Sequence, residues 1–424
     1  MKRIVCLFFA LSFVLGAYSQ EDTPIPSINS PYSMYGYGKM TDLSFARGRA
    51  MGGVGYGFRE GTEINISNPA SYSAVDSMTF IFDAGMSFQN TNLNDGVNKA
   101  NAKNAAFDYV AVQFRLCKRL GLTAGYVPYS NVGYNFSSNA YIDPDDLEGD
   151  YSTNKYTGNG NLQQVLLGLG ANPFGGFSLG ANISYLYGQI NRTVMSTLSD
   201  ASAYVFSKHK TLSIRDYRFD AGIQYAFDFA DSKHQFVIGA VYSLGHTMNS
   251  DSYLQDLKTS SNTVVSVRSD TLKGACDFPQ IFGGGVNYCF DDKLVFAFDY
   301  TLEQWSKCKY VGEDNLFFDR SKYAFGAEYT PNKRGKNFFG RVKYRVGAYY
   351  YTPYLNIDNG KSAREFGISA GAAFPMFGNR SLAHVSFQYS KVNSSNANML
   401  DESYFKLSVG LTFNERWFAK IKVR

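Results

Sequence analysis

Apolar and polar residues alternate along most of the chain after residue 78. In Thr79–Phe88 the large apolar residues fall at every second position, and Tyr404–Phe413 near the C-terminus repeats the pattern. A period of two is typical of a β-strand whose two faces meet different surroundings. The pattern therefore predicts strands with one face against an apolar medium.

Twelve more stretches of this kind lie between these two. They are Phe107–Leu116, Gly121–Tyr129, Leu162–Ala171, Phe177–Gln189, Ser213–Phe229, Gln235–Gly245, Pro279–Phe290, Leu294–Trp305, Lys322–Thr330, Phe338–Tyr351, Glu365–Met376 and Ser381–Lys391. The total of fourteen is even, as in single-chain bacterial outer-membrane barrels. We predict an all-β fold, a 14-stranded antiparallel transmembrane β-barrel over residues 78–414.

The lengths of the connections support this prediction. Every even-numbered strand is followed by a short turn, such as Asp291–Lys293, and every odd-numbered strand by a longer polar segment, such as Ser130–Asn161. Short periplasmic turns and long outer loops alternate in this way in membrane barrels, whereas a soluble β-sandwich has no reason to produce the pattern.

The first 19 residues have the features of a secretory signal peptide. Lys2 and Arg3 precede the apolar run Ile4–Gly16, and Ala17 and Ser19 are small residues before a cleavage point. The apolar run is shorter than the roughly 20 residues that a membrane helix needs. We expect export through a cleaved signal peptide into the cell outer membrane, with residues 415–424 as a periplasmic tail.

Glycine is concentrated just before the strands, within Arg47–Ser73. This segment contains Gly52, Gly53, Gly55 and Gly57, a density that suits a chain pressed against another backbone. Asn68-Pro69-Ala70 then predicts a bend, because Pro69 fixes its own φ and keeps Asn68 extended. We interpret residues 20–77 as a hatch, or plug, inside the barrel, although an ordinary surface loop fits the same residues.

The composition excludes several classes of protein. The formal net charge of +5 falls to +3 once Lys2 and Arg3 are removed, which is too weak to indicate a nucleic-acid partner. The four histidines are scattered, and the cysteines lack C-x-x-C spacing. We therefore expect no metal site, no cofactor and no enzymatic activity.

Two cysteines, Cys276 and Cys308, lie just beyond the outer ends of adjacent predicted strands. Counting back from the turn at Asp291 places them nearly opposite each other. An extracellular disulfide between them is one prediction, and two free thiols are the alternative.

Alternation places many charged side chains in the barrel interior, among them Arg115, Asp299, Glu328, Arg341 and Arg345. One interpretation makes them a polar path for a solute. The other makes them a ladder that holds the plug and fills the interior. Glu328 and Arg341 flank one short turn almost symmetrically, which predicts a cross-strand ion pair.

Pro128 falls in the third predicted strand, which should be central to a closed wall. Proline has no N–H to donate to a strand ladder and is rare away from edges and bulges. Either Pro128 marks a break in the wall that permits lateral opening, or it ends the strand at the outer rim.

The bend and four later stretches together resemble a known family. Asn68-Pro69-Ala70 is followed, in order, by FPQIFGGGVNY, FAFDYTLEQW, YAFGAEYTP and VKYRVGAYYYTPY. These features resemble the FadL-type (OMPP1/FadL/TodX) outer-membrane transporters. The resemblance implies a hatch inside a fourteen-stranded barrel, capture of an apolar molecule outside, and its sideways release through a gap in the wall.

One region departs from that family, because the predicted loop Ser130–Asn161 is acidic, with Asp143, Asp145 and Asp146. Its carboxylates would repel a fatty-acid anion. The leading hypothesis is passive uptake of a hydrophobic or amphipathic small molecule by a protein in contact with outer-membrane lipid and lipopolysaccharide. The alternatives are a barrel that serves protein secretion or surface attachment with a protein partner, and a general solute porin.

Overall fold

The computed structural model describes residues 28–96, 98–141, 150–200, 203–229, 233–260, 263–333, 335–357, 360–376, 380–393 and 400–416. The predicted signal peptide, residues 20–27 of the predicted hatch, the acidic residues Asp143, Asp145 and Asp146, and residues 417–424 of the predicted tail lie outside this part of the chain. Within it, no helix has the length and apolar character needed to cross a membrane.

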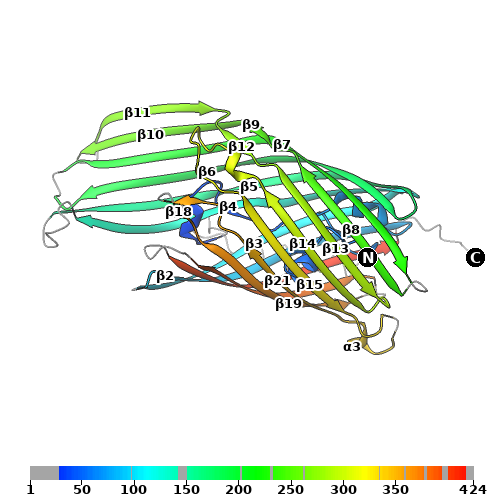
Figure 1. Ribbon diagram of the computed structural model, residues 1–424. Coiled ribbons are helices and arrows are strands. Elements are labelled where there is room, and N and C mark those ends of the chain that lie inside the picture. The colour runs from blue at the N-terminus through cyan, green and yellow to red at the C-terminus, as the bar shows by residue number, and fades with distance from the viewer. Residues whose placement is uncertain are drawn as a thin grey trace, which may run out of the picture.

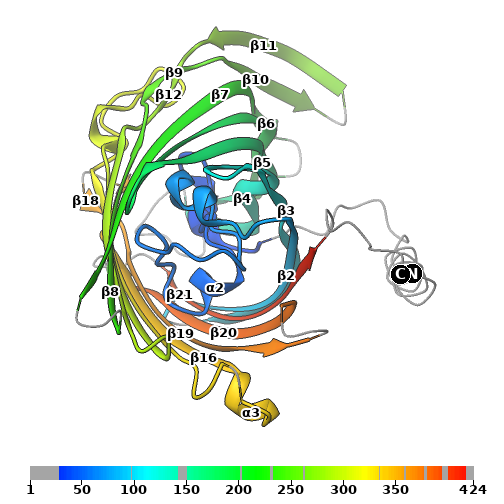
Figure 2. The same ribbon diagram turned by 90° about the vertical axis from the view of Figure 1, so that its right-hand side faces the viewer.

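Fourteen antiparallel strands close into a barrel (Figures 1 and 2). They are β2 (Thr79–Asn94), β3 (Lys99–Cys117), β4 (Leu120–Tyr141), β5 (Tyr151–Phe174), β6 (Phe177–Leu198), β7 (Val205–Phe229), β8 (His234–Ser243), β13 (Ile281–Phe290), β14 (Leu294–Glu303), β15 (Arg320–Tyr329), β16 (Lys343–Tyr351), β19 (Arg364–Pro375), β20 (Leu382–Asn393) and β21 (Asp401–Arg416). Pairing of β2 with β21, from Thr79↔Arg416 to Asn94↔Asp401, joins the two ends of the sheet. The fourteen predicted strands are confirmed.

Several strands run much further at the outer end, where the long connections lie, than the sequence predicted. β4 and β5 pair as far as Tyr141↔Tyr151, so most of the predicted loop Ser130–Asn161 is a hairpin. Another hairpin, β10 (Ser250–Ser260) with β11 (Thr263–Lys273), extends the sheet from β7 and ends in the edge strand β11 (Figure 1). Most residues of these extensions are polar on both faces of the sheet. The alternation of apolar and polar residues that marks a strand is therefore not visible in the sequence there.

Smaller elements complete the chain outside the barrel wall and correct two predicted bounds. The connections at the outer end contain β9 (His246–Met248), β12 (Cys276–Phe278), η4 (Trp305–Lys307), β17 (Asn356–Ile357) and β18 (Gly360–Lys361). The predicted strand Phe338–Tyr351 begins instead with the short helix α3 (Phe338–Arg341). The final strand continues to Arg416, two residues into the predicted tail.

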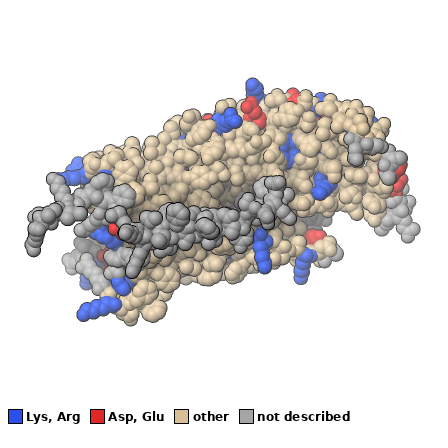
Figure 3. Space-filling model, turned by 180° about the vertical axis from the view of Figure 1, so that it is seen from behind, with Lys and Arg blue, Asp and Glu red and all other residues tan. Residues whose placement is uncertain are grey.

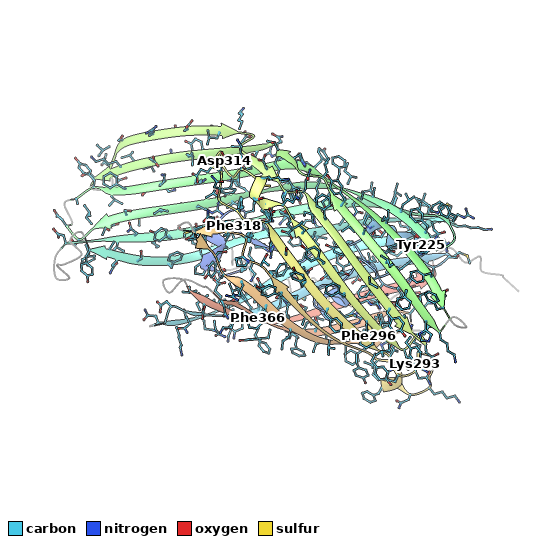
Figure 4. All side chains as sticks on the ribbon, in the orientation of Figure 1. Tyr225, Lys293, Phe296, Asp314, Phe318 and Phe366 are labelled. Atoms are coloured by element: carbon cyan, nitrogen blue, oxygen red, sulfur yellow. The ribbon has the colours of Figure 1, made fainter. Side chains whose placement is uncertain are left out.

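Large apolar side chains cover the outside of the wall. Tyr225, Phe296 and Phe366 are 53%, 38% and 40% exposed and lie on the outer surface of the barrel (Figure 4). Most of the wall visible from behind consists of residues other than Lys, Arg, Asp and Glu (Figure 3). An apolar band of this kind is the surface that a membrane barrel presents to lipid.

The N-terminal segment, residues 28–77, lies inside the barrel (Figure 2). It contains η2 (Pro31–Met34), β1 (Lys39–Met40), α2 (Ala46–Arg49) and η3 (Pro69–Ala74). Met51, Val54 and Phe58 pack with wall residues into one of the buried apolar clusters. The segment therefore supplies much of the interior packing that a barrel of this width needs.

Glycines in the wall let the N-terminal segment approach its backbone closely. A Cβ atom at Gly347 would lie 2.1 Å from the carbonyl carbon of Met51, and one at Gly239 would lie 1.9 Å from the carbonyl oxygen of Tyr56. Gly52 approaches the wall from the other side, because its own Cβ would lie 2.5 Å from the oxygen of Ala348. A side chain at any of these points would force the two backbones apart.

We predict that Gly239→Ala loosens the N-terminal segment. The new methyl group would overlap the Tyr56 carbonyl oxygen, and overpacking of this kind costs about 1–3 kcal/mol. Limited proteolysis should cut within residues 28–77 of this variant much faster than in the wild type. Gly284→Ala is the control, because a Cβ at Gly284 meets no atom within 4 Å. Equal cutting of the two variants would contradict the prediction.

Candidate functional site

The wall has a gap between β3 and β4. These strands pair from Cys117↔Leu120 to Val110↔Tyr126, and the described pairing between them goes no further. Beyond that point β3 pairs only with β2, while β4 continues beside β5 as far as Tyr141. Toward the outer end, the edge of β4 that faces β3 has no strand of the wall beside it. It is bonded there by the N-terminal segment, through β1, through the Thr41 N–H to the Tyr129 oxygen and through the Ser30 N–H to the Gly133 oxygen, both at 2.9 Å.

A register shift lies on each side of this gap. In β3 the shift falls between Tyr109 and Phe107 and leaves Asp108 without a partner on β2. In β4 it falls between Pro128 and Ser130 and leaves Tyr129 without a partner on β5. A bulge bends its strand and ends regular pairing, so the two together account for the separation of the strands.

Pro128 thus lies inside a long strand beside the gap. The prediction that it ends the strand at the outer rim is wrong, because β4 runs on to Tyr141. Proline is tolerated here because a bulge and an edge without ladder partners do not require its missing N–H.

A cavity of about 190 Å³ lies between the N-terminal segment and this part of the wall. Phe107 and Pro128, which flank the gap, are among its lining residues. Phe107 is 49% exposed, so the cavity reaches a residue that also lies on the outer surface. We call this space the gap cavity.

A second cavity of about 140 Å³ lies on the other side of the stretch that includes β1. Met40, Thr41 and Asp42 line both cavities. β1 pairs with the edge of β4 that faces β3 through Lys39↔Asn131 and Met40↔Ser130, and Lys322 binds Asp42 at 3.1 Å. Lys39 also lies 3.7 Å from Glu365, and the Thr41 N–H donates to the Tyr129 oxygen at 2.9 Å. Residues 39–42 are therefore a partition inside the barrel.

The stretch after the partition is fixed by a buried ionic network. It joins three residues of the N-terminal segment, Arg47, Glu60 and Glu63, to three of the wall, Glu328, Lys343 and Arg345. Arg345 lies 2.7 Å from Glu328 and 2.9 Å from Glu63, and Lys343 lies 2.6 Å from Glu63. Three positive and three negative groups balance, so no charge in the network is left without a partner of opposite sign.

The network keeps Glu63 ionised. Burial alone would raise the pKa of this carboxyl group, but Arg345 and Lys343 outweigh burial and hold its pKa well below its usual value. Because the pKa of Glu63 is lower in the folded protein than in the unfolded chain, its ionised carboxylate contributes to stability at pH values above the ordinary pKa of glutamate. This contribution is lost as the pH falls from that ordinary pKa through the lowered one. The N-terminal segment should therefore stay bound at neutral and mildly acidic pH.

The glycine-rich stretch bonds to the wall through its backbone. Asp299 accepts hydrogen bonds from the N–H groups of Gly55 at 2.6 Å and Tyr56 at 2.9 Å. Further backbone contacts of this stretch include Gly52 N–H to Ser369 Oγ at 2.9 Å, Lys322 Nζ to the Gly53 oxygen at 3.3 Å, Gln224 Nε2 to the Tyr56 oxygen at 2.9 Å, and the close approach of Gly57 to the backbone of Asn287. Backbone groups buried without water need such partners.

The bend at Asn68-Pro69-Ala70 lies against the wall. Asn68 is extended, with φ −137° and ψ 110°, and its side-chain oxygen accepts the Ala70 N–H at 3.1 Å. Its amide nitrogen donates to the oxygens of Tyr56 at 2.9 Å and Ile223 at 3.1 Å. The side chain thus joins the bend, the glycine-rich stretch and β7.

Two of the predicted interior charges have other positions. Glu328 pairs with Arg345 across β15 and β16, so the predicted Glu328–Arg341 pair is wrong. Arg341 lies in α3, outside the strand ladder, because the chain forms a helical turn before β16 begins. Arg115 lies at the turn end, where it donates to Ser77 Oγ at 3.0 Å.

The predicted disulfide is also wrong, because Cys276 and Cys308 are free thiols. Cys276 lies opposite Met248 in the β9–β12 pair, and Cys308 donates to the Gln304 oxygen at 3.5 Å. Burial raises the pKa of the Cys308 thiol to about 12. Cys276 faces Tyr310 rather than Cys308 where the connections before β13 and after β14 meet, an offset that a count of residues from the turn did not anticipate.

Sequence reasoning missed Arg47, Glu60, Glu63 and the partition. The three charged residues lie in a segment without periodicity, so nothing in their spacing assigned them to wall partners. No group of three or more His, Cys, Asp or Glu side chains in the described ranges is arranged to hold a metal ion.

A closed fourteen-stranded barrel filled by its own N-terminal segment is the fold of FadL-type outer-membrane proteins. The chain matches the family BamG over residues 1–424 and belongs to that family. No curated protein matches it.

Three solved structures have the same fold. The CymD monoaromatic hydrocarbon channel is 14% identical with a TM-score of 0.60, over 89% of this chain and 98% of that one. The P. putida toluene transporter TodX is 13% identical with a TM-score of 0.61, over 89% and 99%. A Pseudomonas aeruginosa FadL homologue is 12% identical with a TM-score of 0.59, over 88% and 99%.

We predict that Arg345→Met destabilises the protein by about 3–5 kcal/mol, because it leaves Glu63 and Glu328 buried without their shared partner. Urea unfolding in lipid vesicles measures the change. Adding Glu63→Gln should recover part of the loss, since it removes one unpaired carboxylate. Lys293→Met is the control, because the Lys293–Asp291 pair is exposed to solvent and should contribute little to stability. A loss for Arg345→Met as small as that of the control would contradict the prediction.

A second prediction concerns the thiols. Maleimide should label Cys117, which is exposed, in the folded protein, whereas Cys276, Cys289 and Cys308 should react only after unfolding. Mass spectrometry of peptides identifies the labelled residues. Gel mobility should be the same with and without reductant, and faster migration without reductant would contradict the assignment of free thiols.

Proposed function

We propose that this protein is a non-enzymatic outer-membrane transporter that takes up a hydrophobic or amphipathic small molecule passively and releases it sideways into the membrane. The observation that carries the proposal is the position of the gap cavity. Its lining residues Phe107 and Pro128 flank the point where β3 and β4 cease to pair. A molecule in this cavity would be one side chain away from lipid.

The driving force is the transfer of apolar surface out of water, first into the cavity and then into lipid. Hydrophobic channels among proteins of this fold, CymD and TodX, agree with such a role. No chemical step is required, because the ligand moves from one apolar environment to another.

The N-terminal segment would act as the hatch in two parts. Arg47–Ser73 is held by the ionic network and by the bend at Asn68, and would remain in place. Residues 39–42 are held by two β1 pairings, by the Thr41 N–H to Tyr129 oxygen hydrogen bond and by the Lys322–Asp42 and Lys39–Glu365 ion pairs. Displacement of this partition would join the two cavities and give a ligand a route toward the gap.

Two adjacent alanines test the route. Ala106 lines the gap cavity, whereas Ala105 points to the opposite face of β3. We expect Ala106→Trp to fill the cavity and lower the amount of small molecule that co-purifies from native membranes about tenfold, a loss of about 1.4 kcal/mol in binding. Ala105→Trp is the matched control and should retain it. Extraction and mass spectrometry measure the ligand, and equal retention in both variants would contradict the proposed cavity.

A protein partner is the second candidate function. The family name hints at association with a Bam complex. The edge strand β11 pairs on one side with β10, and its residues Val264, Val265 and Val267 are all more than half exposed. A long edge with β-branched residues is a surface on which another chain can add a strand.

Affinity purification from native membranes in mild detergent tests this second function. We expect a stoichiometric partner with the wild type that is lost from the double variant Val265→Lys with Val267→Lys. The control is Tyr253→Lys, which removes an exposed apolar side chain from β10 but leaves the edge intact. A partner retained by the double variant would show that it binds elsewhere, and the lack of any partner would contradict this function.

A further inference from the structure

The lining of the gap cavity is electrically balanced. Four cationic and four anionic residues line it: Lys39, Arg49, Arg320 and Lys406, and Asp42, Asp108, Glu365 and Glu402. A binding site for a carboxylate or a phosphate normally presents an excess of positive charge. This cavity presents none.

Each lining cation already has a carboxylate partner. Arg49 and Lys406 both bind Asp108, at 2.5 Å and 3.4 Å. Lys39 lies 3.7 Å from Glu365, and its ammonium group is also 3.5 Å from the ring centre of Tyr404. An anionic head group would have to displace one of these carboxylates, which would then be buried without a partner.

Arg320 is also paired with a carboxylate, but its partner lies just outside the cavity. It lies 3.7 Å from Glu303 and 4.0 Å from the ring centre of Tyr351. On the anionic side, Asp42 is bound by Lys322 at 3.1 Å. Glu303 and Lys322, which lie outside the lining, carry opposite charges. The net charge therefore stays at zero when these two partners are counted with the lining residues.

Glu402 differs from the other carboxylates. It is 1% exposed and accepts hydrogen bonds from Ser30 Oγ, at 2.9 Å, and from the hydroxyl of Tyr404. Its hydrogen-bond partners are neutral, and Lys39, the cation that attracts it, already pairs with Glu365. A negative charge at Glu402 therefore adds to the repulsion of an incoming anion.

The rest of the lining offers neutral hydrogen-bonding groups and aromatic rings. Tyr349 donates to Glu365 at 3.0 Å and accepts from Gln388 at 2.8 Å, and Gln89 and Asn104 add amide groups nearer the gap. Hydroxyl and amide groups of a ligand can replace water at such positions without disturbing an ion pair.

We propose that the gap cavity selects an uncharged amphiphile, one whose head carries hydroxyl or amide groups and whose apolar chain passes Phe107 and Pro128 toward lipid. This inference rests on the proposed transport function and names the class of molecule that the site accepts. An ionised fatty acid is excluded by the paired cations and by Glu402.

Three probes with the same ten-carbon chain and different head charges test the inference: 1-decanol, decanoate and decyltrimethylammonium. Their binding is measured by calorimetry on the full chain in lipid nanodiscs at pH 8 and low salt, with empty nanodiscs subtracted. We expect 1-decanol to bind at least about tenfold more tightly than either ion.

Glu402→Gln provides a second measurement, because it keeps the shape of the side chain and removes one negative charge from the lining. Decanoate should then bind about tenfold more tightly than it binds to the wild type, and decyltrimethylammonium more weakly. Glu415→Gln makes the same change of charge at the turn end of β21, away from the cavity lining, and should leave the ranking as it is in the wild type. Folding of each variant is checked by its heat-dependent gel mobility. The order of the three probe affinities in the wild type tests the inference even if a variant does not fold.

The outcomes separate this inference from the function on which it rests. If either ionic probe binds the wild type most tightly, the selection of an uncharged head is refuted while a ligand-binding cavity remains. If none of the three probes binds more than to empty nanodiscs, the proposed uptake of an amphiphile is refuted with it.

Discussion

Direct contact between two backbones, that of the N-terminal segment and that of the glycine-lined inner wall, is the constraint on which this structure depends. A closed barrel leaves an interior that must be filled, and here the chain fills it with its own residues 28–77. Close approach at Gly239 and Gly347 brings backbone N–H and C=O groups out of water. Wall side chains such as Asp299 and Gln224 must then satisfy them, which accounts for many of the polar groups inside the barrel.

The same segment is held very unequally along its length. Residues after Phe45 meet the wall through ion pairs, glycine contacts and the bend at Asn68. Residues 39–42 meet it through a two-residue strand, one further backbone hydrogen bond and two ion pairs, and none of the close glycine contacts that follow lies in this stretch. The weakly held part lies between two cavities, and one of these reaches the gap beside β4. A conformational change in this protein would require least energy at that place, because few buried contacts have to be broken there.

The barrel fold is shared with other proteins, whereas the side chains that line its cavities are particular to this chain. A hydrocarbon channel, a toluene transporter and a FadL homologue share the barrel with this chain at 12–14% identity, so the architecture tolerates almost complete replacement of side chains. Specificity must come from the residues that line the cavities, and these form a balanced set of charges with tyrosine and amide groups. The extension of the sheet by β10 and β11 at the outer end adds an edge whose residues Val264, Val265 and Val267 are more than half exposed.

The sequence by itself determined the barrel. Alternation in stretches such as Thr79–Phe88 follows from having lipid on one side and a polar interior on the other, and short turns such as Asp291–Lys293 fixed the order of neighbouring strands. Only the tertiary structure decided which charges meet. Glu328 was assigned to Arg341 by counting from a turn, but the helical turn α3 shifts the register and gives it Arg345. Arg47 and Glu63 lie in a segment without periodicity, and their partners in the wall are 280 to 282 residues away in the sequence. Local pattern specifies a strand and its faces, whereas a contact between distant segments depends on where the whole chain places them.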